Sequence, residues 1–153
     1  MANKKLPPVV TACVFLSFTL HVYRKSLEDL TSQIIMTPKQ VLEKWIDAFN
    51  KADADTISNL YDDNAVNHQV ANEPVVGKPA IKQMFSTEFA NAEMICIPEN
   101  IFEDGDWAIL EWKDPKGLRG CGFFHIKNDK IIFQRGYWDK LTFYKLHNIS
   151  SAD

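Results

Sequence analysis

The chain has 153 residues, of which 46% are hydrophobic and 24% are charged, and its formal net charge is −3 at pH 7. This length suits one domain that buries its own core without disulfides or structural metals. The sequence has no basic stripe, because Lys4-Lys5 and Arg24-Lys25 are only short pairs, and this argues against a nucleic-acid partner.

Residues 1–35 differ in character from the rest of the chain. Asn3-Lys4-Lys5 precede an apolar run from Leu6 to Tyr23, which contains two prolines and ends at Arg24-Lys25. The pattern resembles a secretory signal or a membrane anchor, but no A-x-A-like cleavage site follows, and a span usually needs about 20 predominantly apolar residues. The alternative is a translated extension ahead of a natural start at Met36. We therefore predict an extension over 1–35, a domain over 36–147 and a tail over 148–153. A cytoplasmic location is expected, and anchoring or export through residues 1–25 is the alternative.

Three amphipathic helices are predicted. The first begins at Thr37-Pro38-Lys39-Gln40, a capping box in which Thr37 and Gln40 satisfy each other's backbone N–H groups. Asp53–Tyr61 predicts a shorter second helix, and Gly77-Lys78-Pro79 opens a third. Apolar residues at helical spacing give the buried faces, which are Val41, Leu42, Trp45, Ile46 and Phe49 in the first helix, Ile57, Leu60 and Tyr61 in the second, and Ile81, Met84, Phe85 and Phe89 in the third.

Strands dominate the second half of the chain. Turns at Asp114–Gly117 and Asn128-Asp129 divide an apolar stretch into an antiparallel meander. Its strands are Trp107–Trp112, Leu118–Ile126 and Ile131–Asp139, joined by a fourth strand over Met94–Phe102 and preceded by a short strand over Ala65–Val70. Helices followed by a meander predict an α+β domain with the helices on one face of the sheet.

Cysteines and histidines show no spacing typical of a metal site. Cys13, Cys96 and Cys121 form no C-x-x-C pair and no even-numbered disulfide framework. His21, His68, His125 and His147 share no ligand spacing, and no P-loop or dinucleotide-binding motif occurs. We therefore expect no metal, no nucleotide cofactor and a reducing compartment.

Five short motifs follow one another in a characteristic order. They are Val41–Asn50 with Ala52-Asp53-Ala54-Asp55, Leu60–Ala65, Gly77–Ile81, Glu103–Trp107 and Arg135–Asp139. Through them, residues Thr37–Leu146 resemble the SnoaL-like branch of the nuclear transport factor 2-like superfamily. The resemblance implies a curved antiparallel sheet wrapped around helices, as in a cystatin-like roll, with a conical pocket and often a homodimer. It does not imply one function, because the superfamily holds isomerases, cyclases, epoxide hydrolases, ligand binders and transport adaptors.

The catalytic residues of known relatives are only partly matched. The base of ketosteroid isomerase falls on His68, its tyrosine on Trp45 and its second acid near Gly122. An acid of limonene epoxide hydrolase and of the SnoaL-type cyclases falls at or near Gly136, and the arginine of the hydrolase falls on or beside Glu111. Each of these mechanisms loses essential groups, so none is carried over.

Two ionisable residues are the candidates for chemistry. His68 follows the second helix, and an imidazole can take and return a proton near neutral pH. The alternative is a structural histidine at the mouth of a pocket. Glu111 stands in an otherwise apolar strand, where a carboxylate must be solvated, paired or raised in pKa. It is either a pocket acid/base or the ion-pair partner of Arg119.

Alternation along the strands assigns the pocket wall. Gln134, Gly136 and Trp138 share one face of the last strand, and the resemblance places that face inside the pocket. Gln134 could then bind a carbonyl or hydroxyl group. Glycines in the neighbouring strand mark a bend, which is the more frequent cause, or a bulge or a close ligand approach. The predicted pocket residues are Trp45, Phe49, His68, Phe85, Glu111, Phe124, Gln134 and Trp138.

Two functions stay open. One is a metal-free and cofactor-free acid/base enzyme of isomerase, cyclase or hydrolase type, which binds a small apolar or amphipathic molecule and uses His68 and Glu111. The other is a non-catalytic ligand-binding or dimerisation module with a vestigial cavity. Large or apolar residues such as Cys121, Phe123 and Tyr137 also occupy the outer sheet face, which predicts a homodimer through that face.

Overall fold

The computed structural model describes residues 35–148, so the expectations for residues 1–34 and for most of the tail lie outside the described part of the chain. Four helices and six strands make up this part. They are α2 (Pro38–Asn50), α3 (Ala54–Asn59), β1 (Tyr61–Gln69), β2 (Val75–Val76), α4 (Lys78–Asn91), β3 (Ile97–Asp104), β4 (Trp107–Lys113), β5 (Arg119–Lys127), β6 (Lys130–Trp138) and α5 (Lys140–His147). No helix among residues 35–148 is both long and apolar enough to cross a bilayer.

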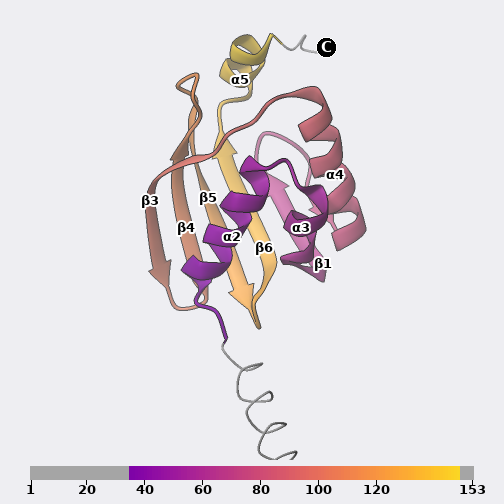
Figure 1. Cartoon of the computed structure of the whole chain (residues 1–153), viewed down its shortest axis with the longest axis vertical. Helices are drawn as coiled ribbons and strands as arrows, with labels where there is room; N and C mark the ends of the chain where they lie inside the picture. Colours follow the sequence, from indigo (N-terminus) through magenta and orange to yellow (C-terminus); the bar gives the residue numbers. More distant parts are fainter. Residues whose placement is uncertain (1–34, 149–153) are drawn as a thin grey trace, which may run out of the picture. The chain divides into compact units, whose positions relative to one another are not determined.

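The strands form one sheet in the order β2-β1-β6-β5-β4-β3, and α2 lies across it (Figure 1). The predicted α+β class and the meander β3–β6 are confirmed. The sheet is mixed, however, because β1 pairs parallel with β6, whereas an antiparallel sheet was expected. Parallel strands need a long crossover connection, and the chain between β1 and β6 supplies it.

Local signals explain most element boundaries. The Thr37 hydroxyl accepts from the Gln40 backbone N–H at 3.3 Å, and the Gln40 side chain accepts from Thr37 N–H at 2.9 Å, so the capping box is confirmed. Asn128 and Asp129 have φ of 50° and 61°, as their tight hairpin requires.

Several boundaries differ from expectation: β1 begins at Tyr61 instead of Ala65, β3 spans Ile97–Asp104 instead of Met94–Phe102, and β2 was not expected. The second helix ends at Asn59, and Tyr61 begins β1 instead of ending the helix. Helix α5 was not predicted at all. Asp139, expected as the end of the last strand, caps this helix by accepting from the Thr142 backbone N–H at 2.6 Å.

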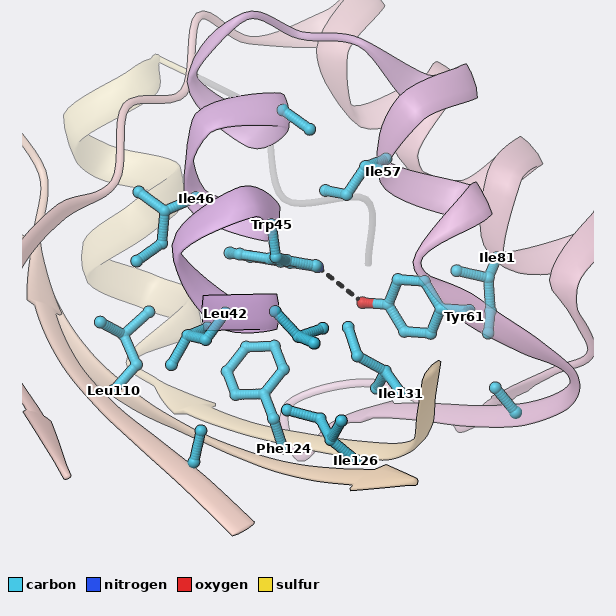
Figure 2. Packing of buried hydrophobic residues seen from close by; sticks show 14 of the residues in the cluster. Leu42, Trp45, Ile46, Ile57, Tyr61, Ile81, Leu110, Phe124, Ile126 and Ile131 are labelled. Atoms are coloured by element: carbon cyan, nitrogen blue, oxygen red, sulfur yellow. Dashed lines mark hydrogen bonds between the residues drawn. The ribbon is translucent and has the colours of Figure 1, made fainter. Parts of the chain in front are cut away.

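The hydrophobic core lies between the helices and one face of the sheet, which we call the inner face (Figure 2). Leu42, Trp45 and Ile46 of α2 meet Leu110, Phe124, Ile126 and Ile131 of the sheet. The Trp45 ring stacks on Phe49 with centroids 5.0 Å apart and meets Phe124 edge-on at 5.2 Å. The core thus orders the aromatic residues around the site described below.

Candidate functional site

A cavity of about 610 Å³ lies between the inner face of the sheet and the helices α2, α4 and α5. This volume is within the usual range for small-molecule sites, roughly 300–1,000 Å³. Most of its wall is apolar and aromatic. Of the predicted pocket residues, the wall includes Trp45, Phe49, Phe85, Phe124, Gln134 and Trp138.

A network of hydrogen bonds fixes Gln134 at the inner face. The Gln134 carbonyl oxygen accepts from the Tyr61 hydroxyl and, at 3.1 Å, from the Asn67 side-chain amide. The Trp45 indole N–H donates to the same hydroxyl at 2.9 Å, the dashed line in Figure 2. Burial raises the pKa of Tyr61 far above its usual range, so the hydroxyl keeps its proton and donates it.

This network leaves donors for a ligand. Both oxygen contacts of Gln134 are occupied, and within residues 35–148 its amide N–H groups donate no hydrogen bond. Gln134 is only 4% exposed to solvent and lines the cavity. Its amide is therefore a held donor in a mostly apolar wall, which is how binding sites orient a polar group of a ligand.

Gln69 occupies the space beside Gly136. The Gln69 amide donates to Asn67 Oδ1 at 2.8 Å, and its oxygen accepts from the Trp138 indole N–H at 3.1 Å. A Cβ atom at position 136 would collide with the Gln69 amide. In the relatives that the sequence resembles, a carboxylate on the last strand lies at or near the position of Gly136. In this chain the Gln69 amide of the neighbouring strand β1 occupies that space.

The prediction that His68 and Glu111 line the cavity is wrong. Asn67 and Gln69 hydrogen-bond at the inner face, so alternation turns His68 to the outer face, in register with Arg135. Glu111 is exposed and accepts from the Asn100 amide at 2.6 Å. Its neighbours Leu110 and Trp112 both line the cavity, so strand alternation carries Glu111 to the opposite side.

Arg119, the possible partner of Glu111, pairs with Glu99 instead. One of its guanidinium nitrogens lies 3.2 Å from a Glu99 oxygen, and Lys113 lies 3.0 Å from the same side chain. These cations hold the pKa of Glu99 below its usual value, chiefly through the Lys113 hydrogen bond. The cluster is on the surface and takes no part in the cavity.

Glu88 of α4 is an ionisable group of the cavity wall that the sequence interpretation did not single out. It is half-buried, and within the described residues it forms no hydrogen bond or ion pair. Burial without a partner raises its pKa to about 7, which places its titration near neutral pH. A signal was present, because Glu88 follows Met84 by four and Phe85 by three residues and so shares their helical face.

Asp114 and His147 form a second polar group on the wall. Their side chains are 7% and 6% exposed, and Asp114 Oδ2 lies 3.2 Å from His147 Nε2. The other Asp114 oxygen accepts from the backbone N–H of Lys116 and Leu118 at 2.9 and 2.8 Å. The contact ties α5 to the β4–β5 turn, so that Phe143 and Tyr144 complete the wall. It was missed because α5 was not expected.

Residues 35–148 contain no cluster suited to a metal ion, and the Cys96 thiol is unreactive. Among residues 35–148, no set of three His, Cys, Asp or Glu side chains is placed to hold a metal ion. Burial raises the pKa of Cys96 to about 12, so this wall thiol stays protonated and is a poor nucleophile.

Comparisons with known proteins agree with this architecture. No curated protein matches the chain. An NTF2-like protein of unknown function from Cytophaga hutchinsonii is 14% identical over 73% of this chain and 98% of its own, with a TM-score of 0.63. A putative isomerase from Bacillus subtilis is 17% identical over 74% and 94%, with a TM-score of 0.66. An LEH-like epoxide hydrolase from M. tuberculosis is 18% identical over 71% and 87%, with a TM-score of 0.61.

At such identities these structures establish the fold alone. The family follows from the sequence itself, because the model of the SnoaL-like domain matches residues 42–134, more than half of the chain. The match begins within α2 and ends in β6, so it covers the core that surrounds the cavity. The chain belongs to the SnoaL-like domain family.

Proposed function

We propose that the cavity binds a small apolar or amphipathic molecule whose polar group accepts a hydrogen bond from the Gln134 amide. The observation that carries this proposal is the held amide in a largely aromatic wall. Tyr61 and Asn67 occupy the carbonyl oxygen of Gln134, so the N–H groups are left for a ligand. Sites of this kind, apolar with a few placed polar groups, are the usual form of small-molecule pockets.

Proton transfer to or from the ligand is the second candidate function, and Glu88 favours it. A carboxyl group with a pKa of about 7 can both take and release a proton at neutral pH. This chemistry belongs to the isomerase, cyclase or hydrolase type. Two similar structures are named as a putative isomerase and an epoxide hydrolase, which supports the proposal by fold analogy only. Without turnover, the same cavity would serve a carrier.

Isothermal titration calorimetry with a neutral probe, 1-naphthylmethanol, tests the binding proposal. Its ring suits the aromatic wall, and its hydroxyl can accept from Gln134. Gln134→Met should weaken binding about 10-fold, the scale of one lost hydrogen bond. Gln83→Met, the same exchange at an exposed position of α4, should leave the affinity within about two-fold. Thermal melts of both variants separate lost binding from lost folding, and a wild-type protein that binds no probe contradicts the proposal.

We also propose that the outer sheet face forms a homodimer. Phe102 and Tyr137 are 58% and 41% exposed there, and both would be covered by a two-fold partner. Sedimentation equilibrium at micromolar concentrations should give twice the mass of the chain. A monomer at every concentration contradicts this assembly.

A further inference from the structure

Within the described part of the chain, the cavity wall contains acidic side chains but no lysine or arginine. Among the described residues that form it, the carboxylic acids are Glu88 and Asp114, and none is a lysine or an arginine. Asp114 is already engaged by His147 and by two backbone N–H groups. Within this wall, Glu88 is thus the acid that a ligand would meet without a competing protein cation.

The lysines of α4, and Lys140 of α5, bind other side chains and not Glu88. Lys78 pairs with Asp63 of β1, and Lys82 pairs with Asp55 of α3. Near α5, Lys140 donates to the Asn72 side chain at 2.9 Å. Other ionisable side chains of the wall, namely Tyr144, Cys96 and Cys121, carry no positive charge at any pH. Among residues 35–148, the cavity wall therefore supplies no lysine or arginine to Glu88, and a ligand could supply the cation.

Aromatic rings surround the same space. Phe85, one helical turn before Glu88, packs edge-on against Phe49 with centroids 6.4 Å apart and against Trp45 at 6.1 Å. All three rings line the cavity. The faces of aromatic rings attract cations, most strongly where water is excluded. An anion would instead meet Glu88, and the described wall residues offer it no lysine or arginine as a counter-charge.

We propose that the ligand carries, besides the group that accepts from Gln134, a protonated amine on its apolar body, with the Glu88 carboxylate as counter-ion and the Trp45, Phe49 and Phe85 rings around the ammonium group. This inference rests on the proposed binding function and names the class of molecule bound. The raised pKa of Glu88 adds a second signature. A bound ammonium group favours the ionised carboxylate, so complex formation near pH 7 releases protons.

Three matched probes separate charge from shape: 1-naphthylmethylamine, 1-naphthylmethanol and 1-naphthoate, which are cationic, neutral and anionic at pH 7. With the full chain, calorimetry should show the amine binding about 10-fold more tightly than the alcohol, because its attraction to Glu88 and the rings outweighs the Gln134 hydrogen bond that only the alcohol can accept, and the naphthoate binding most weakly. Heats measured in buffers of different ionisation enthalpy should report release of about half a proton per amine bound, because a group with a pKa near 7 is half ionised there.

Glu88→Gln should abolish the preference for the amine over the alcohol, and it should also abolish proton release. Glu111→Gln is the matched control, since it removes the same charge from the exposed outer face and should keep the preference. If Glu88→Gln does not fold, the wild-type protein still decides the question. Its preference for the amine should grow from about pH 5.5 to about pH 8 as Glu88 ionises.

The outcomes distinguish this inference from the binding proposal. Binding of the alcohol with no preference for the amine overturns the amine assignment and leaves the cavity as a site for neutral molecules. A preference that persists in Glu88→Gln, or that does not change with pH, also overturns the role of Glu88. Failure of all three probes to bind overturns both proposals.

Discussion

The two faces of the sheet are built from alternate residues of the same strands, yet they use polar groups differently. On the inner face of β6, Gln134 is fixed by hydrogen bonds that leave its amide N–H groups free within the described chain. On the outer face, the Arg135 guanidinium lies 5.8 Å from the Phe123 ring centroid and 5.7 Å from that of Tyr137. The inner arrangement presents a donor to a cavity, whereas the outer one covers a cation with aromatic rings.

The ionisable groups differ in the same way. On the outer side, Glu99 is surrounded by Lys113 and Arg119, so its charge is neutralised within the protein. On the inner side, Glu88 lacks such a partner among residues 35–148, and its pKa rises instead of falling. Unpartnered groups near an apolar cavity mark binding chemistry, while paired groups on a surface mark structure. Four predictions test this contrast.

Substitutions of packed side chains should give the largest difference between the two faces in the free energy of unfolding. Phe124 is 1% exposed and contacts Trp45, whereas Phe102 on the outer face is 58% exposed. Phe124→Ala should lower the free energy of unfolding by about 3–5 kcal/mol. At concentrations low enough to keep the chain monomeric, Phe102→Ala should change it by less than about 0.5 kcal/mol. Urea denaturation measures both, and similar losses at the two sites would mean that the outer face is packed as tightly as the inner one.

The pH dependence of stability should reveal Glu88. Its pKa is raised by burial to about 7 in the folded protein from an ordinary value of 4.5. The folded state therefore holds more protons between these values, and stability falls as pH rises through this window and stays low above it. Glu88→Gln should flatten the fall and raise the free energy of unfolding at pH 8 by up to about 3 kcal/mol.

Denaturation at a series of pH values measures this effect. Glu111→Gln serves as the control, because Glu111 is exposed and should leave the wild-type slope intact. If the free energy of unfolding of Glu88→Gln falls as much between pH 4.5 and 7 as that of the wild type, the pKa of Glu88 is not raised in the folded protein.

The Tyr61 hydroxyl should contribute more to the stability of the fold than the hydroxyl of a tyrosine on the outer face. Tyr61→Phe leaves the Trp45 indole N–H without its acceptor and removes a donor to Gln134. The expected loss is about 1–2 kcal/mol in the free energy of unfolding, the scale for a buried polar group left unpaired. Tyr137→Phe removes a hydroxyl from a 41% exposed residue and should cost less than about 0.5 kcal/mol. Equal costs would argue against a structural role for the network.

Much of the fold could be predicted because its signals are local. The capping box at Thr37, the turn at Asn128-Asp129 and the alternation along β5 and β6 each depend on residues close in sequence. The helical stripe of α2 and the alternation of β6 likewise placed Trp45 and Gln134 on one cavity. Glu88 could also have been predicted from the sequence, since it lies on the apolar face of its helix.

The rest depended on contacts distant in sequence. The face of β1 is set by its parallel pairing with β6 and by a register shift between Tyr61 and Val66, so the match to ketosteroid isomerase placed His68 inside, although it lies outside the cavity. Helix α5 has only eight residues and buries no apolar side chain fully, so it lacks a strong apolar stripe. Its contact with Asp114 joins positions 33 residues apart, which no local pattern predicts.

The smallest effect should come from the two residues that the sequence favoured for chemistry. His68 and Glu111 lie off the cavity wall, and Glu111 already accepts a hydrogen bond from Asn100. A His68→Ala, Glu111→Gln double variant should therefore bind 1-naphthylmethanol with an affinity within about two-fold of the wild type and should unfold at nearly the same urea concentration. Gln134→Met, which changes one inner-face residue, should weaken the same binding several times more. A double variant that loses binding while it stays folded would show that alternation does not separate the two faces functionally, and the assignment of β1 would then have to be reversed.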